Sequence, residues 1–309
     1  MEKIKLDVYK LLIFFIACLA IYFNVIEYGF DYDDYHFVRP YSFQEVANTF
    51  RGNWDAQHIQ VSFYRPLTIA FFALRFELLG FNYQLYHITS LFLFSIAALL
   101  VYKISYFYIK DPAFSMLSAL CMLVYPYMAH SAVAWSTNQM HLLQMLIFLS
   151  AWLLMLKTFP KYFYLLYLIQ VISFLLKEDG ILMFPTLGVI YLITTKNNHF
   201  RNMLRFLIGD FILLIFLVIL RQYFLQNIGG YGTLNFMNIS YTLSSIFLFS
   251  LSTRWDTMLT GYAGLLMQYS IFFLYIIGLY SVLKNHRFHS KLIRFLIAGL
   301  IIISSYTLL

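Results

Sequence analysis

The chain has little charge and almost no cysteine. Only 11% of its 309 residues are Asp, Glu, Lys or Arg, while 61% are hydrophobic and the mean hydropathy is +0.73. Soluble domains carry about 25% charged residues, which they need to cover their surface. This composition therefore excludes a soluble globular protein and a disordered one. Cys18 and Cys121 both lie in apolar stretches, so neither a disulfide framework nor a thiolate metal site is expected.

Long apolar runs are abundant instead, and about 20 apolar residues suffice to cross a bilayer. They predict an all-α transmembrane bundle of about nine spans in a single domain, residues 1–309. The segment 64–80 is expected to be amphipathic and to lie along the outer interface. The segment 240–252 is short for a span and is expected to be interfacial or re-entrant. The predicted spans are 11–26, 86–108, 113–130, 134–156, 162–177, 181–195, 203–225, 259–283 and 293–309.

The distribution of charge predicts the orientation of these spans. With the N-terminus inside, the cytoplasmic segments hold 14 of the 21 basic residues, and ten of the 14 acidic residues lie outside. Lys177 is then the only one of the 11 lysines on the outer side. Because cytoplasmic loops collect Lys and Arg, we expect an integral plasma-membrane protein with an uncleaved N-terminal signal anchor. The net charge of +7 is explained by the basic residues of the inner loops. It therefore gives no reason to expect a nucleic-acid partner.

The first outer loop, residues 27–85, is the longest polar stretch and the expected location of an active site. It opens with Asp31, Asp33 and Asp34 among four aromatic residues. Clustered carboxylates repel one another, so one can acquire a raised pKa and act as a general base. Such carboxylates could also bind a divalent cation, and a solvated acidic helix end is the alternative. The sequence leaves the metal and any other cofactor undetermined.

Two further charged elements suggest a phosphate site. Tyr64-Arg65-Pro66-Leu67 places an arginine just before a proline that can open a helix. A guanidinium at a helix N-terminus suits a phosphate, although an arginine extending to lipid headgroups is the alternative. Lys177-Glu178-Asp179-Gly180 forms a charged outer turn, in which the ammonium could hold a lipid-linked phosphate or pair with a neighbouring acid.

Five histidines lie on the outer side, without the spacing of a metal motif. We interpret them as interfacial hydrogen-bonding residues, one or two of which could contact phosphate: His36, His58, His87, His130 and His141. Inside the predicted spans, Asp210 is the one acidic residue in the seventh. An acid within the membrane is a functional candidate by default, but a buried ion pair with Arg201 or Arg205 is the interpretation we favour.

The order of these elements resembles the membrane glycosyltransferases of the GT-C fold that use polyprenyl-phosphate sugars. Within that group, the chain is most similar to the membrane part of the tetratricopeptide-containing O-mannosyltransferases and their bacterial relatives. The resemblance covers about residues 10–195, and little of it extends into 196–309. It rests on Asp33-Asp34, Tyr64-Arg65-Pro66-Leu67-Thr68, Gly80-Phe81-Asn82 with His87, Ala132-Val133-Ala134-Trp135, and Lys177-Glu178 with Pro185.

The resemblance implies an inverting transfer of a sugar from a polyprenyl-phosphate carrier at the outer, periplasmic face. It implies Asp33 or Asp34 as the catalytic base, with Asp34 favoured. Arg65, Lys177 and His87 would hold the donor phosphate. The remaining cavity residues would be Tyr64, His130, His141 and Glu178. The implied partners are a lipid-linked sugar, membrane lipid and a glycan, lipid or protein acceptor.

The sequence departs from that family pattern at two places. Thr89 and Ser90 stand where an asparagine and a second histidine are usual, and His141 stands where an acid is usual. These departures keep a second hypothesis open, namely a non-catalytic GT-C-like protein that moves lipid-linked sugars or assists assembly. Charged residues that cluster in an outer loop rather than along a pathway argue against an ion or solute transporter.

Overall fold

The computed structural model describes residues 2–31, 33–55, 63–124, 133–158, 161–178, 180, 183, 186–188 and 200–225. The chain divides into two compact units, Met1–Leu187 with His199–Tyr231, and Gly188–Asn198 with Gly232–Leu309. All the described residues except Gly188 belong to the first unit. The predicted spans 259–283 and 293–309 and the segment 240–252 lie outside the described residues, as does most of 181–195.

The described part of the chain is helical, with no strand. The elements are α1 (Glu2–Tyr22), η1 (Phe23–Glu27), α2 (Asp34–Phe37), α3 (Phe43–Thr49), α4 (Pro66–Leu79), α5 (Tyr83–Ile109), α6 (Pro112–Leu123), α8 (Gln139–Thr158), α9 (Phe163–Leu176) and α11 (Phe200–Leu225). Three segments of the described chain are long and apolar enough to cross a membrane: Leu6–Glu27, Tyr83–Ile109 and Gln139–Thr158. They correspond to predicted spans 11–26, 86–108 and 134–156. The all-α membrane prediction is therefore confirmed for this part of the chain.

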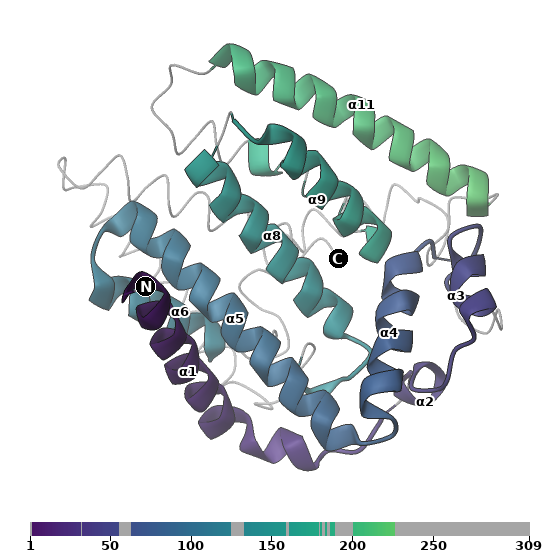
Figure 1. Ribbon diagram of the computed structural model, residues 1–309, viewed down its shortest axis with the longest axis horizontal. Coiled ribbons are helices and arrows are strands. Elements are labelled where there is room, and N and C mark those ends of the chain that lie inside the picture. Colours follow the sequence, from purple (N-terminus) through teal and green to yellow (C-terminus); the bar gives the residue numbers. More distant parts are fainter. Residues whose placement is uncertain are drawn as a thin grey trace, which may run out of the picture. The chain divides into compact units, whose positions relative to one another are not determined.

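The helices pack in a row in which each contacts the next. Helix α5 contacts α1, α6 and α8, α8 contacts α9, and α9 contacts α11 (Figure 1). The short helices α2 and α3 lie with α4 beside the ends of the long helices, at the lower right of Figure 1, and α4 also contacts α9. The polar first loop thus folds against the ends of the long helices, which is the arrangement that positions the candidate site.

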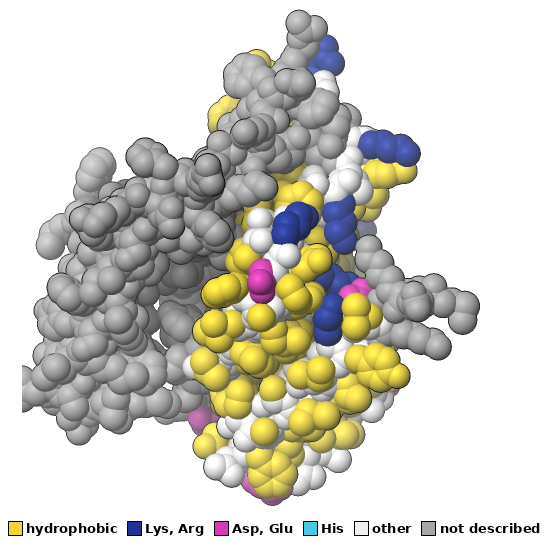
Figure 2. All heavy atoms as spheres, turned by 90° about the vertical axis from the view of Figure 1, so that its left-hand side faces the viewer, with side chains coloured by type: hydrophobic (Ala, Val, Ile, Leu, Met, Phe, Trp, Pro, Cys, Tyr) yellow, Lys and Arg dark blue, Asp and Glu magenta, His cyan; other side chains and the backbone are white. Residues whose placement is uncertain are grey.

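Apolar side chains remain on the outside of this row. Residues of α1 such as Leu12, Ile13 and Ile16 are each about half exposed, and Figure 2 shows hydrophobic side chains over much of one face. In water such a surface would be unstable, whereas in a bilayer it faces lipid.

Local sequence signals set the helix ends around the site. Pro66 opens α4 at its first turn, where the missing N–H costs nothing. Gly80, with φ 55°, ends α4, and the side chain of Asn82 accepts a hydrogen bond from the N–H of Leu85 to cap α5. Helix α8 begins at Gln139 rather than at the predicted 134, because Ser136 and Thr137 form a turn whose N–H groups bind a side chain of the first loop.

Candidate active site

Asp34 lies at the start of α2 and its side chain is fully buried, with 0% exposure. One carboxylate oxygen, Oδ1, accepts a hydrogen bond from the backbone N–H of Thr137 at 2.7 Å. The other, Oδ2, accepts from the N–H groups of Ser136 and Asp31, both at 3.3 Å. Asp34 therefore joins the first loop to the turn that precedes α8, about 100 residues further along the chain.

The environment of Asp34 raises the pKa of its carboxyl group. Burial is the larger effect, because it disfavours the charged form. The three backbone N–H groups oppose burial by stabilising the carboxylate, but they do not cancel it. A carboxylate with a raised pKa binds a proton more tightly, which is the property that a general base needs.

Arg75 of α4 lies beside this carboxylate and is only 6% exposed. Its Nη1 donates a hydrogen bond to the carbonyl oxygen of Ser136 at 3.0 Å, and its guanidinium lies 4.1 Å from the centre of the Tyr86 ring. Burial lowers the pKa of Arg75 to about 10, against the opposing effect of Tyr86 and Asp34. At neutral pH the group is still charged, so a buried cation stands next to the buried carboxylate.

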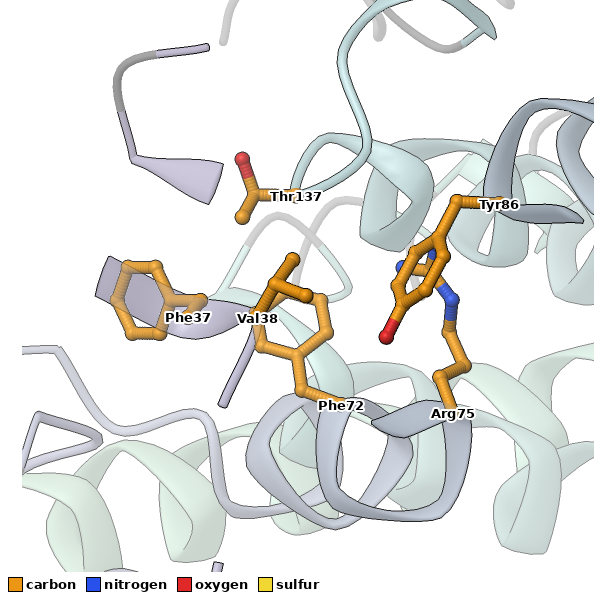
Figure 3. A pocket seen from close by; sticks show the side chains of 6 residues that line it. All are labelled: Phe37, Val38, Phe72, Arg75, Tyr86 and Thr137. Carbon is orange, nitrogen blue, oxygen red and sulfur yellow. The ribbon is translucent and has the colours of Figure 1, made fainter. Parts of the chain in front are cut away.

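A small pocket lies at this point, between the first loop and the helices α4 and α5. Figure 3 shows the Arg75 side chain reaching from α4 to lie against the ring of Tyr86, with Phe72 and Val38 on the other side. The residues that line the pocket are Phe37, Val38, Phe72, Arg75, Tyr86 and Thr137. Its empty volume is about 180 Å³, which is smaller than the roughly 300–1,000 Å³ of most small-molecule sites.

Arg65 and Glu178 form the second part of the site. The guanidinium Nε of Arg65 donates to Oε2 of Glu178 at 2.7 Å, and Nη2 donates to Oε1, so the pair is bidentate. The guanidinium also lies over the rings of Phe63 and Trp54, at 3.8 and 4.7 Å from their centres. Arg65 is 4% exposed, which contradicts the alternative that it extends to lipid headgroups.

The charge of Glu178 is stabilised by this arrangement. Burial alone would raise the pKa of its carboxyl group. The hydrogen bonds and positive charge of Arg65, together with the charge of Lys177, outweigh burial and lower that pKa. Glu178 is therefore a carboxylate at neutral pH, and its ion pair is with Arg65. The alternative that Lys177 pairs with Asp179 concerns a residue outside the described part of the chain.

The structure brings Lys177 close to His141 of α8. Nζ of Lys177 lies 3.4 Å from Nδ1 of His141, and Lys177 is buried. Met140, the neighbour of His141, contacts Arg65 through its sulfur, 3.9 Å from Nη1. The turn before α8 thus binds Asp34 through Ser136 and Thr137. The first turn of α8 contacts Arg65 and Lys177 through Met140 and His141.

The remaining predicted residues have structural contacts. Tyr64 donates its hydroxyl to the carbonyl oxygen of Phe50 at 3.1 Å and stacks on Phe224 of α11. His87 is fully buried, with Nδ1 at 3.0 Å from the carbonyl oxygen of Val133 and Nε2 at 2.9 Å from that of Tyr28. His87 therefore ties the end of η1 to the segment before α8.

Asp33 and His130 complete the predicted set. Asp33 is the N-cap residue of α2 and is partly buried, more open than Asp34. His130 lies outside the described residues, as does His58. Among the residues that are described, no group of three or more His, Cys, Asp or Glu side chains is placed to hold a metal ion.

The predicted ion pair between Asp210 and Arg205 is wrong. Asp210 is buried and its carboxylate faces Gln170 of α9, while Arg205 is exposed. The reason is helical geometry, because facing residues on a helix are three or four positions apart, whereas Arg205 and Arg201 precede Asp210 by five and nine. Asp210 lies at the contact of α9 with α11.

Sequence reasoning placed Arg75 only in an interfacial segment and gave it no role. A signal was present, because Arg75 falls on the same helical stripe as Thr68 and Phe72, both buried.

The sequence analysis also gave no role to Gln144 of α8. In the amide orientation that satisfies its hydrogen bonds, its oxygen accepts from the N–H of Gly180 at 2.9 Å, and so fixes the turn that carries Lys177 and Glu178.

Comparison with known protein families finds a match to one family. The dolichyl-phosphate-mannose-protein mannosyltransferase family matches residues 65–221, about half of the chain. The matched segment includes Arg65, Arg75, His141, Lys177 and Glu178, while Asp34 precedes it. No curated protein and no solved structure matches the chain.

Proposed function

The chain belongs to the dolichyl-phosphate-mannose-protein mannosyltransferase family of GT-C-type membrane glycosyltransferases, and we propose that it transfers a sugar from a polyprenyl-phosphate carrier to an acceptor hydroxyl at the outer face of the membrane. The acceptor is a glycan, a lipid or a protein. The observation that carries the proposal is the buried carboxylate of Asp34, with its raised pKa, beside the small pocket between the first loop and the helices α4 and α5.

In the proposed reaction Asp34 accepts the proton of the acceptor hydroxyl. The oxygen so activated attacks the anomeric carbon from the face opposite the phosphate, so the configuration inverts. The bond between the anomeric carbon and the phosphate oxygen breaks, and its electron pair leaves with the polyprenyl phosphate. The proton remains on Asp34 until it passes to the outer solution.

The leaving phosphate gains negative charge during this step and needs fixed cations nearby. Lys177 and Arg65 are proposed for this role. Glu178 already accepts hydrogen bonds from Nε and Nη2 of Arg65. A phosphate would therefore bind Nη1, whose hydrogen-bond partner in the described structure is the sulfur of Met140. In this proposal Glu178 holds the guanidinium in place.

The outer location of the reaction is supported by the distribution of lysines, with Lys177 alone on the outer side. A membrane-bound donor also requires chemistry at the level of the bilayer. The Asp34 and Arg65 clusters both lie where α4 and the start of α8 meet, at the ends of membrane-length helices.

The proposal can be tested in cells. Surface glycans and glycolipids are compared by mass spectrometry among wild-type cells, cells lacking the protein, and cells with Asp34→Asn. We expect one sugar to disappear from the same molecules in both altered strains. Loss in the deletion strain but not in the Asp34→Asn strain would contradict catalysis by Asp34 and support the non-catalytic alternative, a translocase or assembly partner.

A further inference from the structure

We infer that Arg75 is a positioning residue that sets the proton affinity of Asp34 through a single peptide group. The inference rests on the proposed function, because it concerns the base of that reaction. Its starting point is a chain of two hydrogen bonds. Arg75 Nη1 donates to the carbonyl oxygen of Ser136 at 3.0 Å, and the N–H of Thr137 donates to Oδ1 of Asp34 at 2.7 Å.

These two bonds use the opposite ends of the same peptide group. The Ser136 carbonyl and the Thr137 N–H belong to one planar unit, so they point in opposite directions. A cation bound to the oxygen draws electron density toward it and makes the N–H a stronger donor, which is how consecutive hydrogen bonds reinforce one another. The guanidinium thus stabilises the charged form of Asp34 without touching it.

The position of Arg75 is otherwise hard to explain. Its Nε and Nη2 atoms are buried and make no hydrogen bond to any described residue, and no carboxylate there lies within ion-pair distance of the side chain. Burying a cation with unsatisfied donors costs stability. Such groups are found where a function requires them, and the bond to the Ser136 carbonyl is the hydrogen bond that this guanidinium makes in the described structure.

Few other charges can control Asp34. The titratable side chain that faces it from α5 is Tyr86, and from α4 it is Arg75. On its own loop the neighbours are Asp31 and Asp33, while the turn before α8 supplies backbone N–H groups. Arg75 is therefore the cation in this set, because Tyr86, Asp31 and Asp33 bring no positive charge.

The inference predicts how activity depends on pH. Removing Arg75 withdraws both the positive charge and the polarisation of the peptide group, so Asp34 binds its proton more tightly. The acidic limb of the pH profile, which reports the free base in kcat/KM, then moves to higher pH, by roughly half a pH unit or more. A merely structural role would instead lower the rate by the same factor at every pH.

The test uses the full-length protein in detergent, with release of free polyprenyl phosphate as the signal. The donor is the total lipid extract of cells that lack the protein, and the solubilised envelope fraction of the same cells supplies the glycan, lipid and protein acceptors. Arg75→Gln keeps a donor for the Ser136 carbonyl without the charge, and Arg75→Lys keeps the charge. We expect the acidic limb to move for Arg75→Gln and to stay closer to wild type for Arg75→Lys. Arg51→Gln removes an exposed charge from the same loop as the control.

A second readout does not depend on turnover. Infrared difference spectra across a pH titration report the carboxyl band that Asp34→Asn abolishes. Titration of that band at higher pH in Arg75→Gln than in wild type supports the inference, and an unchanged midpoint overturns it. If the wild type releases no polyprenyl phosphate at any pH, the proposed function fails, and the infrared titration still decides whether Arg75 controls Asp34.

Discussion

Arg65 and Glu178 form a bidentate ion pair between the first loop and the turn that carries Lys177. The two residues are 113 positions apart in sequence, so the pair is a tertiary link rather than a local one. The rings of Phe63 and Trp54 lie against the guanidinium and shield it from water. The first loop and the Lys177 turn therefore meet in one fixed geometry.

The pair should contribute to stability because it is mostly buried. Removing one partner leaves the other charge without compensation, which costs about 3–5 kcal/mol at buried sites. We expect Glu178→Gln to lower the unfolding temperature of the purified protein clearly. Glu45→Gln is the matched control, because the Arg39–Glu45 pair is more exposed and such pairs contribute about 1 kcal/mol or less. Equal effects of the two substitutions would contradict this account.

The same pair predicts a dependence of stability on pH. The pKa of Glu178 is lower in the folded protein than its ordinary value of 4.5. Its contribution is therefore complete above pH 4.5, and it is lost as the pH falls through the lower folded pKa. We expect the difference in unfolding temperature between wild type and Glu178→Gln to shrink on acidification below pH 4.5. A difference that grows there would have the wrong sign.

Gly180 should tolerate no side chain. A Cβ atom there would lie 2.5 Å from the backbone carbon of Ser173 and 2.6 Å from the nitrogen of Phe174, and helical backbone cannot move aside. We expect Gly180→Ala to displace the turn with Lys177 and Glu178, lowering both transfer and unfolding temperature. Gly29→Ala is the control, because nothing lies within 4 Å of its added Cβ. Wild-type behaviour of Gly180→Ala would show that the turn packs differently.

The two roles considered for His87 can be separated by experiment. A phosphate ligand, the role that the family resemblance implies, would raise the donor KM when removed. The contacts of both ring nitrogens with carbonyl oxygens instead favour a structural role. A neutral imidazole carries one N–H, so His87→Leu would remove the donor of one of these carbonyl oxygens, and a buried acceptor left unsatisfied costs about 1–3 kcal/mol. We expect a lower unfolding temperature with an unchanged donor KM, while a raised KM at unchanged stability would support the phosphate role.

Much of the helical framework follows from local sequence signals. Pro66 and Gly80 mark the ends of α4, and long apolar runs mark α1, α5 and α8. These features act within a few residues, so propensity and periodicity suffice to find them. The start of α8 differs from prediction because Asp34 binds the N–H groups before it, and that contact joins residues about 100 positions apart.

The site was predictable in its residue types more than in its connections. Aspartates after the first span, an arginine before a proline and a lysine outside the predicted cytoplasmic segments each stood out from their surroundings. The pairing of Arg65 with Glu178 and the burial of Arg75 beside Asp34 depend on how α4, α8 and α9 pack. The type of a single residue does not reveal which helices pack together. For the same reason, the partner predicted for Asp210 was wrong.

The central claim is that Asp34 is the base of a sugar transfer, and one measurement tests it directly. Purified wild type, Asp34→Asn and Asp33→Asn are each incubated with lipid extract and solubilised envelope fraction from cells that lack the protein. Free polyprenyl phosphate is then quantified by mass spectrometry. Unfolding temperatures of the three proteins control for loss of fold. We expect release by wild type, a fall of about 100-fold or more for Asp34→Asn, and a smaller fall for Asp33→Asn. Undiminished release by folded Asp34→Asn would contradict the account.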